Sequence, residues 1–246
     1  MAFTSFRFIV FLVLAAAAYF LTPKRCRWVT LFVANYVFYF ISGGRIFIYL
    51  LATTVTTYLA TVKIGDMAAK NKIAFNEAKA ELDKEGKKAW KAAFAKKKKR
   101  ILIPTLLFNF GILAVLKYSG FVTENLNLLF AKIGIGTELP VFRFLLPLGI
   151  SFYTFQSMGY LIDVYREKQE PERNFCKLAL FISFFPQIVQ GPISRFGTLA
   201  EQLFRANEFS YTRIKFGVQL MLWGAFKKMV IADRAAVLVD NAFGFP

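Results

Sequence analysis

The sequence contains no histidine and only two cysteines among its 246 residues. Cys26 and Cys176 form no C-x-x-C pair and no metal-ligand spacing, so we expect no metal site. Both lie beside basic residues, which we expect on the cytoplasmic side, so we expect reduced thiols. The phosphate-binding patterns G-x-x-x-x-G-K-[ST] and G-x-G-x-x-G are also missing, which leaves nucleotide chemistry without support. We therefore expect no bound cofactor.

Long apolar runs are what the chain has in abundance. Hydrophobic residues make up 57% of it, and phenylalanine alone occurs 30 times. A soluble domain is nearer about 45–50% apolar, and a helix that crosses the bilayer needs roughly 20 mostly apolar residues. The sequence therefore predicts an all-α, polytopic bundle of transmembrane helices, with six to eight membrane segments. The predicted segments are 3–21, 28–41, 46–62, 101–116, 141–165, 175–189 and 214–231. The segment 175–189 either crosses or re-enters.

Acidic residues are scarce, and the net charge is +17. The stretch 63–100 holds 13 Lys/Arg against 5 Asp/Glu, and basic residues of membrane proteins collect in the cytoplasm. It is either an interfacial helix on anionic lipid or a solvated loop that fixes topology. No soluble domain remains that could bind nucleic acid. We therefore divide the chain into three N-terminal helices (1–62), a basic cytoplasmic loop or interfacial helix (63–100) and a membrane core (101–246), with the N-terminus outside.

Polar residues interrupt the apolar segment at 147–166, PLGISFYTFQSMGYLIDVYR. On a helix, Tyr153, Gln156, Tyr160 and Asp163 are spaced three, four and three apart and share one face, with Ser151 offset from it. Unpaired polar groups are costly in hydrocarbon, so this face must point into the protein or a wet cavity. It lines either a polar substrate path or a set of interhelical hydrogen bonds.

A second polar stretch is FFPQIVQGPISRF at 184–196. Its two prolines remove amide donors and break a helix. Gln187, Gln190 and Arg195 are polar at membrane depth or at its edge. Broken, polar-lined segments are how membrane proteins build sites, although a structural kink gives the same pattern.

Together the two stretches resemble the two signatures of the membrane-bound O-acyltransferase family, and most closely its bacterial branch that acts in alginate O-acetylation. KYSGFVTENLNLL at 117–129 and GVQLMLWGAFKKMVIADRAAVLVDNAF at 217–243 are similar to the same branch. The resemblance implies a helix bundle around a tunnel through the bilayer. It also implies acyl transfer from a cytoplasmic donor, acetyl-CoA or an acyl carrier, to an extracellular polysaccharide or a partner acetyltransferase.

The sequence departs from that family in one respect. The family's catalytic residue is a histidine in the later part of the fold, where it would act as general base, and this chain has none. We therefore expect that the chain is a fragment and that it does not turn over substrate alone. We assign no catalytic residue in it. A non-catalytic scaffold and a transporter with a midplane site at its broken helices are the alternatives.

Overall fold

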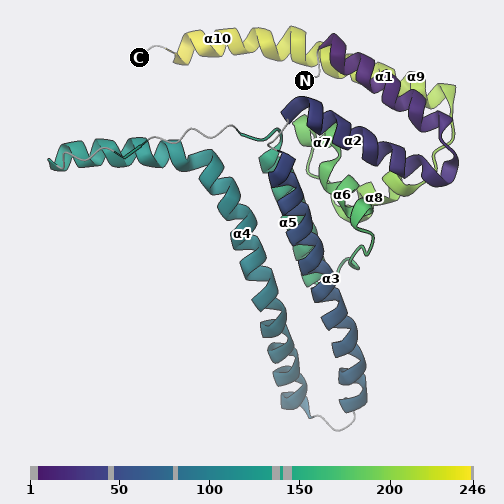
Figure 1. Cartoon of the computed structure of the whole chain (residues 1–246), viewed down its shortest axis with the longest axis vertical. Coiled ribbons are helices and arrows are strands. Elements are labelled where there is room, and N and C mark those ends of the chain that lie inside the picture. The colour runs from purple at the N-terminus through teal and green to yellow at the C-terminus, as the bar shows by residue number, and fades with distance from the viewer. Residues whose placement is uncertain (1–4, 44–46, 80–82, 135–138, 141–145, 245–246) are drawn as a thin grey trace. The chain divides into compact units, whose positions relative to one another are not determined.

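The computed structural model describes residues 5–43, 47–79, 83–134, 139–140 and 146–244 (Figure 1). Every regular element within these ranges is helical, so the predicted all-α class is confirmed. The chain divides into two compact units. One contains residues 1–27 and 206–246, and the other contains residues 28–205.

The larger unit is built on two long helices, α3 (Phe47–Ala78) and α4 (Lys84–Ile133), which run side by side over much of their length (Figure 1). Both are long and apolar enough to cross a membrane. In their apolar halves the Asn109 side chain donates to the Thr56 hydroxyl at 3.1 Å. Such a polar contact lets two helices associate where no hydrophobic effect is available.

The basic stretch 63–100 continues these two helices instead of forming an element of its own. Lys63 to Ala78 belongs to α3, and Lys84 to Arg100 belongs to α4. The Trp90 indole donates to the Asn71 side chain at 3.0 Å, and the Phe75 and Trp90 rings lie 6.1 Å apart. Both rings are half-buried, and their contact joins the polar part of α3 to the polar part of α4. The fourth apolar segment likewise extends to Ile133, beyond the expected end at 116.

The other helices of the larger unit are shorter. They are α2 (Arg27–Gly43), α5 (Ile150–Tyr165), α6 (Phe175–Ser183), α7 (Phe185–Gln190) and α8 (Phe196–Phe204). Helix α5 packs against α3, α4, α6 and α7 and so lies at the centre of the unit. It begins at Ile150, directly after Gly149, which has a φ of 70°. The expected start of this segment, at 141–145, lies outside the described residues.

The segment after α5 returns along α3. A Cβ on Gly65 of α3 would lie 2.3 Å from Cγ of Pro171, so the glycine permits this close approach. The Tyr58 hydroxyl donates to the Arg173 carbonyl at 2.8 Å, and Arg173 pairs with Asp66 at 2.7 Å. These contacts fix the direction in which the chain enters α6.

The smaller unit contains α1 (Phe6–Leu21), a short 3₁₀ turn η1 (Lys24–Cys26), and the helices α9 (Tyr211–Phe226) and α10 (Asp233–Phe243). A π-helical segment η3 (Lys227–Ala232) joins α9 to α10. Lys228 and Asp233 form an ion pair at 2.6 Å. Their separation of five residues suits the π-helical register.

Candidate functional site

The polar face of α5 lies inside the larger unit. Tyr153 is fully buried, Gln156 and Tyr160 are each 2% exposed, and Ser151 and Asp163 are half-buried. Gly149, Tyr153 and Gln156 follow at intervals of four and three residues, so they share one face. That face meets a break in the neighbouring chain, between α6 and α7.

The break follows from one proline. In a continuous helix, the nitrogen of Pro186 would face the Ile182 carbonyl, but proline has no N–H and its ring clashes there. The helix therefore stops at Ser183, and Phe184 takes a non-helical ψ of 101°. Helix α7 restarts at Phe185, which places Pro186 in its first turn, where the missing N–H costs nothing.

Two buried amides bind two of the backbone groups that the break sets free. The Gln156 side chain donates to the Phe181 carbonyl at 2.9 Å. The Phe185 N–H, which would bond that carbonyl in an intact helix, donates instead to the Asn35 side-chain oxygen at 2.7 Å. Asn35 in turn donates to the Leu31 carbonyl of α2 at 2.8 Å and is fully buried. We call Asn35 and Gln156 the amide clamp.

Close packing of α5 on α7 completes the break. A Cβ on Gly149 would lie 1.8 Å from Cγ2 of Ile188 and 2.7 Å from its carbonyl oxygen, so only glycine fits. Gly149 also needs its left-handed φ, which side chains disfavour. The Tyr39 hydroxyl lies 3.4 Å from the Leu148 carbonyl, and the Phe38 ring is 5.0 Å from that of Phe185.

The predicted site residues of the second stretch, 184–196, differ in how deeply they are buried. Gln187 is 6% exposed, and its amide donates to the Pro192 carbonyl within the turn that follows α7. Arg195 is exposed and precedes α8. The side chain of Gln190 lies outside the described residues.

Tyr160 and Asp163 serve other neighbours. The Tyr160 hydroxyl accepts from the Glu172 N–H at 2.7 Å, and its ring packs 4.7 Å from that of Phe196. No ion pair joins Asp163 to Arg166, although both residues lie in the described part of the chain. Gln156 and Tyr160 thus each form a hydrogen bond with a backbone group of the protein.

Five buried side-chain atoms have no hydrogen-bond partner in the part of the chain that the structure describes. They are Tyr36 Oη, Thr57 Oγ1, Tyr153 Oη, Ser183 Oγ and Gln187 Oε1. Unpaired buried polar groups are rare in folded proteins and call for a specific explanation. Three of the five belong to Tyr153, Ser183 and Gln187, which flank the break.

Among the described charged residues, Lys98 alone is buried. Its ammonium donates to the Tyr165 carbonyl at 2.9 Å and to Glu167 at 2.5 Å, and it lies over the rings of Phe94 and Tyr165. It therefore caps the C-terminal end of α5, where a cation is favoured. Tyr153 precedes Tyr165 by 12 residues, which is about 18 Å along α5. The charge of Lys98 therefore lies far from the break.

Sequence reasoning missed three of these residues. Asn35 is a lone amide in an apolar run and carried a signal that could have been used, because a buried amide needs a partner. Ser183 and Lys98 carried none, since a serine in a short apolar helix and one lysine among five consecutive cations look ordinary.

The chain is similar to known proteins along almost its whole length. It is 33% identical over 248 residues to the probable alginate O-acetylase of Azotobacter vinelandii, covering 99% of this chain and 44% of the relative. The probable alginate O-acetylase of Pseudomonas aeruginosa is 32% identical over 248 residues, with 99% and 42% covered. The peptidoglycan O-acetyltransferase of Helicobacter pylori is 33% identical over 170 residues, with 58% and 31% covered.

No family model and no solved structure matches the chain. The chain spans less than half the length of the curated relatives it matches. These relatives nevertheless include both alginate and peptidoglycan O-acetylating proteins. The alginate O-acetylases agree with what the two signature stretches at 147–166 and 184–196 led us to expect. The resemblance to the membrane-bound O-acyltransferase family is thereby confirmed, and the chain corresponds to the N-terminal part of proteins of the alginate O-acetylase kind.

Proposed function

We propose that the chain is the N-terminal, membrane-embedded part of an O-acyltransferase that transfers an acyl group to a polysaccharide outside the membrane. Its similarity to O-acetylases indicates that this acyl group is acetyl. The observation that carries this proposal is the similarity over 99% of the chain to probable alginate O-acetylases. The two long apolar helices support the membrane location. The family that the chain resembles uses a histidine as general base, and this chain has none, so we infer that this base comes from outside these 246 residues.

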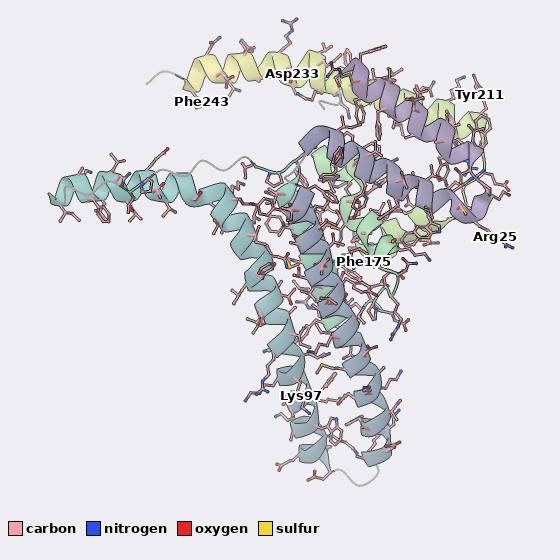
Figure 2. The ribbon with its side chains drawn as sticks, in the orientation of Figure 1. Arg25, Lys97, Phe175, Tyr211, Asp233 and Phe243 are labelled. Carbon is pink, nitrogen blue, oxygen red and sulfur yellow. The ribbon has the colours of Figure 1, made fainter. Side chains whose placement is uncertain are left out.

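The arrangement of charge supports an orientation with the 63–100 arms in the cytoplasm and the N-terminus outside. Lys96, Lys97, Lys99 and Arg100 are exposed around α4, just before its apolar part begins at Ile101. Figure 2 labels Lys97 on this part of α4. Lys98 ties the same level to the end of α5. A belt of cations at one end of a bundle is typical of the cytoplasmic face.

The shortness of α5, α6 and α7 supports a polar site at membrane depth. The 16 residues of α5 reach about 24 Å, less than the roughly 30 Å of hydrocarbon, and α6 with α7 is interrupted by its break. We infer that α6 and α7 re-enter rather than cross. The substrate path then runs past the break, with Ser151, Tyr153, Gln156, Tyr160, Asp163, Gln187, Gln190 and Arg195 as its candidate residues.

The donor is acetyl-CoA or an acyl carrier on the cytoplasmic side. The acceptor is an extracellular polysaccharide or a partner acetyltransferase. We therefore expect the chain to contact binding partners on both faces of the membrane, in addition to the lipid bilayer. We expect acyl transfer only in a protein that also contains the histidine-bearing part of the fold. Residues 1–246 then act as scaffold and path.

A chimeric protein tests the function. Residues 1–246 replace the aligned segment of the Pseudomonas aeruginosa relative, in a strain that lacks the native protein. We expect the chimera to restore O-acetyl groups to the alginate, measured by proton NMR of the purified polymer. The purified 246-residue chain should transfer no acetyl group. A chimera that inserts and folds but leaves the polymer unacetylated would contradict the proposal and favour the scaffold or transporter alternative.

The two native cysteines test the orientation. Cys26 is exposed and Cys176 is half-buried, and both belong on the cytoplasmic side in this topology. A membrane-impermeant maleimide should label them in inverted vesicles and not in intact cells. Labelling from outside would reverse the assigned orientation.

A further inference from the structure

Four exposed cations surround α4 where its apolar part begins. They are Lys96, Lys97, Lys99 and Arg100, and the apolar part starts at Ile101. We propose that Lys96 and Arg100 bind the phosphate group of an anionic phospholipid whose acyl chains lie along α4. The inference rests on the membrane location proposed above and does not depend on acyl transfer.

Helical geometry places these two cations on the side of α4 that faces away from α5. Each residue advances an α-helix by about 100°, so Lys96 and Arg100 lie about 40° apart, and Lys98 points about 160° from either of them. Lys98 is the buried member of the run and bonds the Tyr165 carbonyl at the end of α5. Lys96 and Arg100 are exposed, so the helical spacing and the burial agree on the direction of the two cations.

The same side of α4 stays exposed and becomes apolar as the helix enters the bilayer. Ile103 and Leu107 follow Arg100 at intervals of three and four residues, so they share its stripe. Ile103 is 49% exposed and Leu107 is 68% exposed. The rise from Arg100 to Leu107 is about 10 Å, which lies within the roughly 15 Å of one leaflet. Acyl chains that cover Leu107 therefore end in a headgroup near Arg100, and the flexible Lys96 side chain, one turn farther out, reaches the same headgroup.

The protein supplies no counter-charge for these two cations. The residues three and four positions from Lys96 and Arg100 along α4 include no acidic residue. Among the described residues, no ion pair joins either cation to a carboxylate. Lys96 and Arg100 are themselves four residues apart, and like charges at that spacing destabilise a helix. An anion from outside the chain removes this repulsion.

Position and charge favour a lipid over a soluble anion. The outer end of the arm carries Asp83 and Glu85 beside Lys84, so a soluble acidic protein would meet mixed charge there. Free phosphate would pair with Arg100 but leave the apolar stripe uncovered. A phospholipid supplies both parts, because its phosphate accepts two hydrogen bonds from the planar guanidinium and its chains cover the stripe. A zwitterionic headgroup brings a cation of its own, which competes for the phosphate, so the ligand carries a net negative charge.

Photocapture at position 107 tests the inference. Leu107 is replaced by p-benzoylphenylalanine in the full 246-residue chain, which is reconstituted in vesicles of equal parts phosphatidylglycerol and phosphatidylcholine. Mass spectrometry of the cross-linked product gives the ratio of the two lipids beside this position. We expect an excess of phosphatidylglycerol, because each nearby cation favours an anionic headgroup about fivefold. Inorganic phosphate, compared with sodium chloride at equal ionic strength, should not lower the ratio.

Charge variants locate the headgroup. Lys96→Gln and Arg100→Gln should each lower the ratio about fivefold. Lys84→Gln combined with Lys88→Gln is the matched control, because both lysines are exposed on the same helix. They lie at least about 18 Å from Arg100, beyond the screening length of about 8 Å. The control should leave the ratio unchanged.

Three outcomes would contradict this reading. Equal capture of the two lipids by the chain with its native cations, or an equal response to both sets of variants, would overturn the inference. A ratio that falls with inorganic phosphate but not with sodium chloride would assign the cations to a soluble anion and overturn it too. A chain that captures no lipid at position 107 would contradict the membrane location itself.

Discussion

The side chain of Gln156 donates to the backbone carbonyl of Phe181 at 2.9 Å, in a place where an unbroken helix would offer the Phe185 N–H. That N–H is bonded to Asn35 instead. One helical hydrogen bond is thus replaced by two bonds to buried amides from α2 and α5. The broken segment is therefore specified by its neighbours as well as by its own proline.

Loss of Asn35 should destabilise the larger unit. Asn35→Ala leaves the Phe185 N–H buried without an acceptor, which costs about 1–3 kcal/mol. Asn76→Ala, at an exposed position of α3, should change stability by less than about 0.5 kcal/mol. The free energy of unfolding of the purified chain in mixed micelles checks both values. Equal effects of the two substitutions would show that the Asn35 bond contributes nothing.

Two glycines of the same region should respond in opposite directions. Gly149→Ala forces a methyl group against Ile188 and a side chain into a left-handed φ, so we expect a loss of about 2–3 kcal/mol. Gly159→Ala lies within α5 with nothing within 4 Å of its Cβ. It should be neutral or gain up to about 1 kcal/mol of helix propensity. Thermal unfolding distinguishes the two, and a tolerated alanine at position 149 would contradict the described packing of α5 on α7.

Within the run of lysines at 96–99, we expect Lys98 to contribute to the stability of the fold. Lys98→Met leaves the Tyr165 carbonyl without its donor and should cost about 1–3 kcal/mol. Lys97→Met, one residue away and exposed, should stay within about 0.5 kcal/mol. Thermal unfolding of the two variants under the same conditions is the measurement. A larger loss for Lys97→Met would mean that α4 is rotated relative to α5.

The acid titration of Glu208 should depend on Lys24. The hydrogen bond and the charge of the Lys24 ammonium lower the pKa of the Glu208 carboxyl below its usual 4.5. A lowered pKa means that the folded state favours the ionised form, so the contact contributes stability above the unfolded pKa. That contribution is lost as the pH falls through the folded value.

Carbon NMR of the Glu208 carboxyl measures this pKa. The substitution Lys24→Met should raise the pKa toward its usual value. Both side chains are largely exposed, so the difference should shrink at high salt. The same pKa in the Lys24→Met chain would show that the ion pair does not form in solution.

Much of this architecture follows from local sequence, and some of it does not. The apolar runs indicate helices, and the intervals between Tyr153, Gln156 and Tyr160 place them on one face, because helical periodicity is a local property. Pro186 likewise indicates the break. The bond partners of Gln156 and Asn35 depend on which helices meet, and a sequence does not state this.

The basic stretch shows the same limit. Its composition indicates helix and cation-rich surface, but the pairing of Phe75 and Asn71 with Trp90 joins residues from two arms. That pairing turns an expected separate element into the continuation of α3 and α4. The inward turn of Lys98 has the same cause, since it depends on where α5 ends.

The most direct test of the account is acetyl transfer by the chimeric protein carrying Gln156→Leu. Leucine keeps the bulk of the side chain and removes the donor to Phe181, so the chain should still insert, while the break loses its alignment. Misplacement by about 1 Å lowers enzymatic rates by up to about a hundredfold. We predict at least about tenfold less acetate on the polymer per inserted protein molecule, whereas an unchanged acetate content would contradict a role for the α5–α7 break in acyl transfer.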